Sequence, residues 1–417
     1  MKILVIGGGG REHALVRSLK KSPRVKQLYC APGNGGISRD AVCLPISATD
    51  IDALVKVAEK EAFDMVLVTP DDPLAMGLAD RLQEAGVRAF GPKKNAAVIE
   101  SSKAFAKELM KKYGIPTAPY RTFSDSEKAV EYIRSHGAPV VVKADGLALG
   151  KGVAVAGTVE EAEDSVRAMM DGNKFGDAGR LAVIEDLMTG PEVTVLAFTD
   201  GRTVVPMPSS RDRKRAFDGD KGPNTGGMGA ISPAPGYTPQ IAEYCMKNIF
   251  RPTVNAMAAE GRPFKGVIYF GLMLTNEGPK VVEYNARFGD PETQAVLSLL
   301  DTDLIDIFDA VIDEKLGETP VKFKPGAACC VVLASGGYPA EYKTGYEITL
   351  PDEMPRDVVV YHAGTKLQDG AYFTSGGRVL GVTATGGDLE SAVSSAYEGV
   401  SQIGFKDMFY RSDVGAV

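Results

Sequence analysis

The chain has 417 residues, 44% of them hydrophobic and 24% charged, which is typical of a folded protein with two or three domains. Its net charge of -7 argues against a broad nucleic-acid or anionic-membrane surface. Five cysteines without CxxC spacing and only three histidines assemble no zinc site. No segment predicts a membrane span or a signal peptide. We expect a cytoplasmic protein with small-molecule partners, and no nucleic-acid or membrane partner.

The first hundred residues predict an α/β unit. The strand patterns ILVIG, QLYCAP, DMVLVTP and VRAFGP alternate with helical patterns such as IDALVKVAEKEA, which is βαβ order. The glycine run GGGGREHAL follows the first strand but does not fit GxGxxG, so NAD is not expected. We expect Gly9, Gly10 and Arg11 to lie near Asn34 at one sheet edge and to seat a phosphate. The alternative is a tight strand-to-helix turn.

A helix from about Asn95 to Tyr113, ending at Gly114, precedes a second region with hairpin signals. There the stretch VVVKADGLALGKGVAVA, residues 140–156, predicts a glycine loop that caps a hairpin. It lacks the spacing of a Walker loop and the Ser or Thr that would hold Mg²⁺. We expect the loop to cover nucleotide phosphates, with Lys143 on the strand beneath. An ordinary hairpin with incidental lysines is the alternative.

Residues 181–198 predict two strands around a connector that carries Glu185 and Glu192. Such a connector can offer backbone groups to an adenine edge and a carboxylate to ribose hydroxyls. Taken alone, the pattern fits solvent-facing carboxylates better.

The segment 210–235, SRDRKRAFDGDKGPNTGGMGAISPAP, concentrates charge and glycine where a packed core needs neither. Its arginines and lysines predict an anion site, and its glycines allow close approach of backbone N–H groups. The alternative is a polar surface loop.

A strand through Val281 to Arg287 would place Glu283, Asn285 and Arg287 on one face by period-two alternation. A carboxylate and an amide oxygen are hard ligands suited to Mg²⁺, and Arg287 would clamp an anion nearby. The alternative is an exposed polar face on an edge strand. From about Pro325 the chain is again strand-rich and ends on a helical pattern near residues 389–403, which predicts a third, smaller unit.

The joint order of GGGGREHAL, APGN, ESSKAFAKE, VVVKADGLALGKGV, DGDKGPNTGGMGAISPAP, RFGDPETQ and SGGRVLGVTATG resembles the glycinamide ribonucleotide synthetases of the ATP-grasp superfamily. The resemblance spans nearly the whole chain. It implies a multidomain α/β and α+β fold: a Rossmann-like N-terminal domain (1–100), an ATP-grasp domain (101–325) with a mobile lid at about 120–192, and a β-rich C-terminal domain (326–417). It also implies ATP-dependent ligation of glycine to 5-phosphoribosylamine in purine biosynthesis, through glycyl phosphate.

The resemblance also assigns roles to single residues. Contacts to ATP, the co-substrate, are implied for Lys103, Lys143, Gly146, Gly150, Lys151, Gly152, Glu185, Leu187 and Glu192. Ligands to Mg²⁺ or Mn²⁺ are implied for Glu283 and Asn285. The ribose phosphate is expected at Gly9, Gly10, Arg11 and Asn34, and the reaction centre at Asp212, Lys214, Arg287 and Asp290, with Gly226 and Gly227 stabilising an oxyanion.

Three positions and one segment depart from the family pattern. The family usually has His at Arg213, Glu at Pro191, Cys at Ala286 and a GPEAP-like segment where this chain has TPDDP at 69–73. Only the last of these would touch substrate, and its carboxylates Asp71 and Asp72 would alter how phosphoribosylamine is held. The alternative function is therefore a different ATP-grasp carboxylate-amine ligase. A nucleotide-binding regulatory protein without turnover is a more distant one. Neither the oligomeric state, monomer or dimer, nor the role of the C-terminal unit follows from the sequence.

Overall fold

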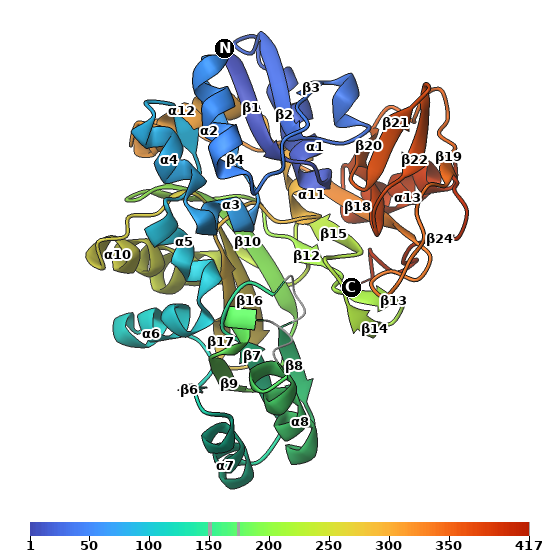
Figure 1. Ribbon diagram of the computed structural model, residues 1–417. Coiled ribbons are helices and arrows are strands. Elements are labelled where there is room, and N and C mark those ends of the chain that lie inside the picture. The colour runs from blue at the N-terminus through green and yellow to red at the C-terminus, as the bar shows by residue number, and fades with distance from the viewer. Residues whose placement is uncertain (149–151, 173–175, 417) are drawn as a thin grey trace.

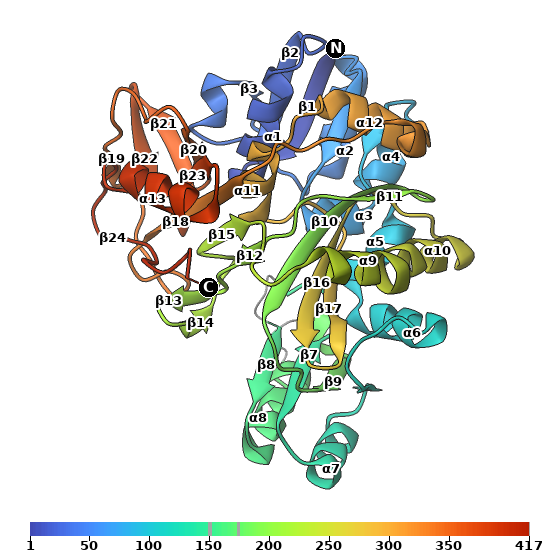
Figure 2. The same ribbon diagram turned by 180° about the vertical axis from the view of Figure 1, so that it is seen from behind.

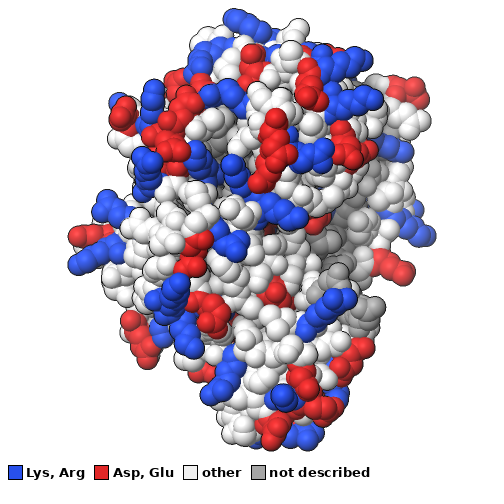
Figure 3. Space-filling view, turned by 60° about the vertical axis from the view of Figure 1, so that its left-hand side comes forward, with Lys and Arg blue, Asp and Glu red and all other residues white. Residues whose placement is uncertain are grey.

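The protein is described here by a computed structural model that covers residues 1–148, 152–172 and 176–416. Figure 1 shows an N-terminal sheet at the top, a central sheet below it, a small sheet projecting at the bottom and a C-terminal unit at the side. Figure 2 shows the same arrangement from behind. No helix among the described residues is long and apolar enough to cross a membrane. Basic and acidic side chains are interspersed over the face in Figure 3.

The N-terminal sheet is parallel and confirms the expected βαβ order. Its strand order is β3-β2-β1-β4-β5. The apolar residues of β1 alternate between two cores: Ile3 and Val5 lie in the cluster that contains α1, and Leu4 and Ile6 lie in the cluster that contains α2. The bounds are β1 Lys2–Gly7, α1 Gly10–Lys20, β2 Gln27–Pro32, β3 Val42–Cys43, α2 Ile51–Lys60, β4 Met65–Val68, α3 Asp71–Met76, α4 Leu78–Glu84 and β5 Ala89–Phe90.

The prediction of a single helix from Asn95 to Tyr113 is wrong, because the helix is interrupted at Ser102. Two helices form, α5 Lys94–Ser101 and α6 Lys103–Tyr113. Ser102 is extended, with φ of -139°, and its hydroxyl accepts a hydrogen bond from the Phe105 N–H at 3.1 Å. A serine that caps a new helix satisfies one of the free N–H groups of the first turn. The break places Lys103 at the start of α6. Gly114 ends this helix at φ +66°, as expected.

The small sheet is antiparallel, with the order β6-β9-β7-β8. Its elements are β6 Tyr120–Phe123, α7 Ser126–His136, β7 Val140–Ala144, β8 Val153–Ala156, α8 Val159–Met170 and β9 Ala182–Asp186. Apolar residues of α7 and α8 pack with those of β7 in one core. The pairing of β7 with β8 confirms the hairpin beneath the glycine loop. Residues 149–151, and with them Gly150 and Lys151, lie outside the described residues.

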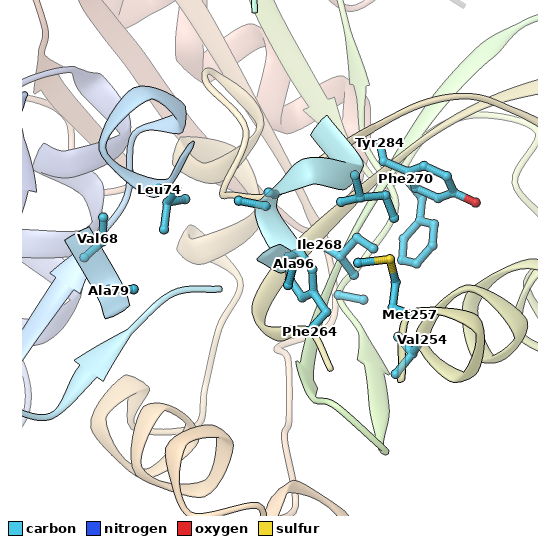
Figure 4. Packing of buried hydrophobic residues seen from close by; sticks show 14 of the residues in the cluster. Val68, Leu74, Ala79, Ala96, Val254, Met257, Phe264, Ile268, Phe270 and Tyr284 are labelled. Atoms are coloured by element: carbon cyan, nitrogen blue, oxygen red, sulfur yellow. The ribbon is translucent and has the colours of Figure 1, made fainter. Parts of the chain in front are cut away.

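The central sheet has the order β11-β10-β16-β17, with its strands antiparallel. Figure 4 shows Val254 and Met257 of α10 facing Ile268 and Phe270 of β16. β17 ends at Asn285, so Arg287 lies beyond the strand that was expected to carry it. The bounds are β10 Glu192–Asp200, β11 Val204–Pro206, α9 Pro239–Cys245, a π-helical turn Met246–Phe250, α10 Arg251–Ala259, β16 Lys265–Thr275, β17 Gly278–Asn285, α11 Glu292–Ser298 and α12 Leu304–Ile312.

The C-terminal sheet includes strands from the polar segment 210–235. β12 Arg211–Asp212 and β15 Gly229–Ser232 form one side of the order β12-β15-β18-β23-β20, and β24 pairs with β18. Between them, β13 Arg215–Phe217 and β14 Lys221–Asn224 form a separate two-stranded hairpin. The other elements are β18 Ala327–Ser335, β19 Glu347–Ile348, β20 Val358–His362, β21 Thr365–Gln368, β22 Ala371–Thr374, β23 Arg378–Gly386, α13 Leu389–Val400 and β24 Met408–Phe409.

Candidate active site

A cleft of about 1180 Å³ lies where the sheets meet, and all parts of the chain contribute to its wall. Arg11 comes from the N-terminal unit, and Tyr338 and Arg378 come from the C-terminal unit. Of the residues expected in the site, those that line it are Arg11, Lys103, Lys143, Gly152, Glu185, Leu187, Glu192, Asp212, Lys214, Gly226, Glu283, Asn285, Arg287 and Asp290. The cleft therefore gathers residues that lie far apart in the sequence.

Glu185 is held between two lysines at the cleft wall. Its Oε1 lies 2.9 Å from Nζ of Lys143, and its Oε2 lies 2.9 Å from Nζ of Lys107. All three side chains are buried, so the pairs are shielded from water. Desolvation lowers the pKa of Lys107 to about 8, although Glu185 acts against this shift. Lys107 was not predicted from the sequence, although its place one turn after Lys103 on α6 was an available signal.

Lys103 is positioned by the residue that follows β7. The Asp145 carboxylate accepts hydrogen bonds from the Ala104 N–H at 2.6 Å and the Ser102 hydroxyl at 3.1 Å. A carboxylate at a helix N-terminus is favoured by the free N–H groups and by the helix dipole. Nζ of Lys103 donates to the Gly146 carbonyl at 3.0 Å, and desolvation lowers the pKa of this lysine. The start of α6 is thus tied to the glycine loop.

An apolar stretch of the wall accompanies these lysines. It is suited to a flat ring, because ligand sites combine apolar surface with a few placed polar groups. The connector between β9 and β10 contributes Leu187 and Met188 to it. Further apolar residues of the cleft include Ile99, Ala106, Met110, Val141, Leu147, Ala148, Val153, Val155, Val282 and Met273.

Lys214 also lines the cleft and stands among carboxylates. Its Nζ lies 2.8 Å from Glu192 Oε2 and 3.7 Å from Glu283 Oε1. Desolvation acts against its charge, but the carboxylates of Glu192, Asp212 and Glu283 prevail and raise the pKa of Lys214. Desolvation also raises the pKa of Asp212, although Lys214 opposes that shift. Lys214 is therefore a fixed cation beside a carboxyl group that holds a proton more readily than usual.

Glu283 and Asn285 both line the cleft from β17, as expected, but Val282 and Tyr284, which the alternation placed on the other face, line it too. Burial opposes ionisation of Glu283, but Lys214, Lys143 and the other nearby cations lower its pKa. Arg287 returns to the cleft beyond the strand, and its Nη2 donates to the Asn285 amide oxygen at 3.2 Å.

Glu100, which the sequence analysis missed, holds this strand end. It lies 3.3 Å from Arg287 and accepts a hydrogen bond from the Ala286 N–H at 2.7 Å. Desolvation raises the pKa of this buried carboxyl to about 7, with Arg287 opposing and Asp71 reinforcing the shift. Its position next to the SSK sequence gave no indication of this contact.

Asp290 joins the N-terminal and C-terminal units. Its carboxylate accepts hydrogen bonds from the Arg11 N–H at 3.2 Å and from Gln294 at 2.8 Å, and lies 3.3 Å from Nη1 of Arg378. Burial opposes ionisation, but Arg378 and Arg11 lower the pKa of Asp290. Arg378 also donates to the Gly226 carbonyl at 2.7 Å. The C-terminal unit therefore contributes directly to the cleft.

Gly9, Gly10, Asn34, Gly146 and Gly227, although expected in the site, are not among the cleft-lining residues. The Gly9 N–H donates to the Glu12 carboxylate at 2.6 Å. A Cβ on Gly10 would come within 2.5 Å of the Gln294 amide nitrogen, so a larger residue there would displace the end of that side chain.

Asn34 and the glycines after β14 have internal partners as well. The Asn34 amide donates to the carbonyls of Gly8 and His362, while its oxygen accepts from two backbone N–H groups. The Gly226 N–H donates to the Tyr338 hydroxyl at 3.0 Å, and the Gly227 N–H donates to the Thr225 hydroxyl at 2.9 Å. These groups hold the walls together, and their roles toward a substrate stay predictions.

The oxygen donors of Glu283 and Asn285 fit a magnesium ion. Within the described residues, no three His, Cys, Asp or Glu side chains gather closely enough to hold a metal by themselves. Mg²⁺ is usually bound by one or two protein carboxylates together with substrate phosphates and water. One ionised carboxylate and one amide oxygen beside a cluster of lysines match this pattern.

Comparisons with known proteins agree with this arrangement. Residues 1–100, 101–293 and 328–417 match the N, ATP-grasp (A) and C domains of phosphoribosylglycinamide synthetase. A phosphoribosylamine–glycine ligase of Vibrio parahaemolyticus is 48% identical over the whole chain and 98% of its own length. The crystal structure of the Thermotoga maritima ligase has a TM-score of 0.86 at 35% identity, covering 99% of this chain and all of that one.

The fold also occurs outside this family. The biotin carboxylase domain of 2-oxoglutarate carboxylase from Hydrogenobacter thermophilus, solved with MgADP and bicarbonate, has a TM-score of 0.74 at 17% identity, and the match covers 98% of this chain and 91% of that one. This likeness concerns the fold alone. The full-length matches at 35% to 48% identity decide the family. The chain belongs to the phosphoribosylglycinamide synthetase family, whose central domain is an ATP-grasp domain.

Proposed function

We propose that the chain ligates glycine to 5-phosphoribosylamine with ATP, by way of glycyl phosphate, as a step of purine biosynthesis. The family supports the substrates, since its curated members carry the name phosphoribosylamine–glycine ligase. The cleft supports the chemistry, because it places lysines, arginines and carboxylates around one cavity. The single observation that carries the proposal is the Lys214 ammonium, which lies in the cleft between the carboxylates of Glu192 and Glu283.

We place the nucleotide between the small sheet and β17. The apolar stretch around Leu187 and Met188 would receive the base, and Glu192 the ribose hydroxyls. Lys103 and Lys143 would lie along the phosphates, where their charge offsets that of the transferring group. The glycine loop after β7, with Gly146 and Gly152, would cover the phosphates and exclude water, which an acyl phosphate intermediate requires.

Glu283 and Asn285 would hold Mg²⁺ or Mn²⁺ against the phosphates. A bound ion would act as a Lewis acid on the phosphoryl oxygens. Glu283 is suited to this role because the surrounding cations keep its pKa low and its carboxylate ionised. Asn285 would exchange its contact with Arg287 for the ion, which leaves Arg287 free to bind an anion.

In the first step a glycine carboxylate oxygen attacks the γ-phosphorus of ATP, the bond to the bridging oxygen breaks, and ADP leaves. Lys103, Lys143 and Lys214 stabilise the negative charge in transit, and Arg287 orients the glycine carboxylate. The protein contributes mainly positioning and charge, as in other phosphoryl transfers.

In the second step the amine of phosphoribosylamine attacks the acyl carbon, and phosphate leaves as the C–N bond forms. The attacking nitrogen must lose a proton. Asp212 would accept it, because burial raises the pKa of its carboxyl toward the working range of a base. Arg11, Asp290 and Arg378 would surround the phosphoribosyl group at the other end of the cleft.

The test is ADP release from ATP and Mg²⁺ with freshly generated phosphoribosylamine, comparing glycine with alanine, serine and no amino acid. We expect release only when glycine and phosphoribosylamine are both present. Turnover with another acid or amine would keep the ligase chemistry but move the substrate, and would point first to Asp71, which lines the cleft. Binding of ATP without turnover for any pair would contradict the proposal. Cytoplasmic location and the absence of nucleic-acid or membrane partners stay predictions.

A further inference from the structure

The hairpin β13–β14 is held by residues from the far end of the chain. It pairs with no other strand within the described part of the chain, and most of its residues are exposed. An isolated two-stranded hairpin is at best marginally stable in water. Yet three of its residues, Arg215, Asp220 and Asn224, line the cleft. Something other than its own pairing must therefore fix this part of the cleft wall.

The segment 411–416, which we call the terminal clamp, makes the contacts that hold the hairpin. Arg411 is fully buried, and its guanidinium donates to Asp220 at 2.7 Å and to the Arg215 carbonyl at 3.2 Å. The same guanidinium is held by Asp413 through two hydrogen bonds of 2.7 Å. A buried arginine must have its N–H donors satisfied. Its partners belong partly to the hairpin (Asp220 and Arg215) and partly to the segment 411–416 (Asp413), so Arg411 joins the two.

The loop of the hairpin binds the clamp a second time. The Gly219 N–H donates to Asp413 at 2.8 Å, and the Ser412 N–H donates to Asp218 at 2.9 Å. The Ser412 hydroxyl also donates to Asp218. Asp220, between these contacts, has φ +53°, a left-handed conformation that a non-glycine residue keeps only when its surroundings hold it.

Arg213 joins this clamp to the reaction centre. It lies in sequence between Asp212 and Lys214, and its backbone is fixed by hydrogen bonds to Gly229 and Met228. Its side chain is buried and donates to the carbonyls of Val414, at 3.2 Å, and Ala416. Its Nη1 also lies 3.6 Å from Asp220. One arginine thus contacts both the clamp and the hairpin.

We propose that Arg213 and Arg411 are positioning residues, which use the segment 411–416 to hold the β13–β14 hairpin and the Asp212–Lys214 strand end against the cleft. Neither arginine is assigned a role in the chemistry. The hairpin wall would be formed only while the clamp is in place. The effect on turnover rests on the proposed function, whereas the effect on the hairpin itself does not.

Two independent readouts test the proposal. The first is trypsin cleavage after Lys221, an exposed residue of β14, followed by mass spectrometry on the full-length protein. Arg213→Gln, Asp413→Asn and a chain ending at Tyr410 should each speed this cleavage, by about tenfold for the shortened chain, because cleavage follows the opened population. Arg356→Gln, an exposed arginine of the same unit, is the matched control and should leave cleavage unchanged.

The second readout is steady-state kinetics. We expect kcat/KM for glycine and phosphoribosylamine to fall about tenfold in Arg213→Gln, with a smaller loss in Arg213→Lys, while the affinity for ATP stays within about twofold. In the shortened chain Arg213→Gln should have little further effect, since the Val414 and Ala416 carbonyls are gone and only Asp220, at 3.6 Å, remains as a side-chain partner. If the shortened chain fails to fold, Arg213→Gln and Asp413→Asn decide the question.

Unchanged cleavage after Lys221 in these two variants would overturn the proposal, whatever the activity. Additive effects of Arg213→Gln and the shortening would also overturn it. A wild-type protein without ligase activity that still shows the cleavage differences would instead contradict the proposed function and leave the clamp supported.

Discussion

Arg378 donates a hydrogen bond to the main-chain oxygen of Asp290 at 2.8 Å, and its guanidinium lies 3.3 Å from the Asp290 carboxylate. The first residue belongs to β23 of the C-terminal sheet and the second precedes α11. Because Asp290 also accepts from the Arg11 backbone, one carboxylate links three parts of the chain. The C-terminal unit is therefore part of the cleft wall.

We expect Arg378→Gln to lower kcat/KM for phosphoribosylamine by about 100-fold or more, because a partly buried carboxylate and the Gly226 carbonyl lose their donor. The KM for ATP should change little. Steady-state kinetics with each substrate varied in turn measures this. Arg356→Gln is the matched control, and equal losses for all three substrates would show a general structural defect instead.

Lys107→Met should destabilise the protein by about 3 kcal/mol, because Glu185 would remain buried with one of its two cationic partners removed. The KM for ATP should rise in parallel. Thermal unfolding and ATP titration check both effects. Lys112→Met on the same helix is the control, since that side chain is 64% exposed and should cost little. Similar unfolding temperatures for the two variants would contradict the buried-pair account.

Glu100 gives the protein a pH dependence of known sign. Its pKa is raised from 4.5 to about 7, so the folded protein binds more protons than the unfolded chain between these values. The contribution of this group to the free energy of unfolding is therefore fully present at low pH. It is lost as the pH rises from about 4.5 to 7, and the loss is roughly 3 kcal/mol at most. Arg287, Asp71, Arg11 and Lys103 are charged groups that interact with it.

Glu100→Gln should remove this dependence. The unfolding temperature of the variant, relative to wild type, should be higher at pH 8 than at pH 5.5. Glutamine keeps an acceptor for the Ala286 N–H, which limits other damage. The same difference between the two proteins at both pH values would be evidence against a raised pKa at Glu100.

Glu283→Gln should reduce kcat by about 100-fold or more at ordinary Mg²⁺ concentrations, because the ion would lose its one charged protein ligand. Part of the loss should be recovered by raising Mg²⁺ or by supplying Mn²⁺. Glu277→Gln, an exposed carboxylate near the same strand, is the control. A metal titration that is identical for Glu283→Gln and wild type would exclude Glu283 as a ligand.

The sequence predicted the elements of the fold whose patterns are local. The alternation in β17 correctly placed Glu283 and Asn285 together, and the hairpin at 140–156 was correct. The break at Ser102 was not predicted, because the helical pattern continues across it and only the cap with Phe105 reveals it. Sequence periodicity does not register such a cap, although serine is a preferred N-cap residue.

The residues that sequence reasoning missed act over long distances. Arg378 and Tyr338 reach the cleft from another unit, and no local pattern marks a contact across 152 residues between Arg378 and Gly226. The opposite also occurs, since Gly9 and Asn34 have the residue types of a phosphate site but use their groups on internal partners. Residue type alone therefore does not distinguish a group that binds phosphate from a group that holds the wall of the cleft.

The most direct test of the acyl phosphate chemistry is an oxygen-transfer measurement. Glycine labelled with ¹⁸O in its carboxylate is turned over with ATP and phosphoribosylamine, and the released phosphate is analysed by mass spectrometry. Attack of the carboxylate on ATP predicts one labelled oxygen in each phosphate and one in the product amide. Phosphate without label, released at the same rate as product, would contradict the account.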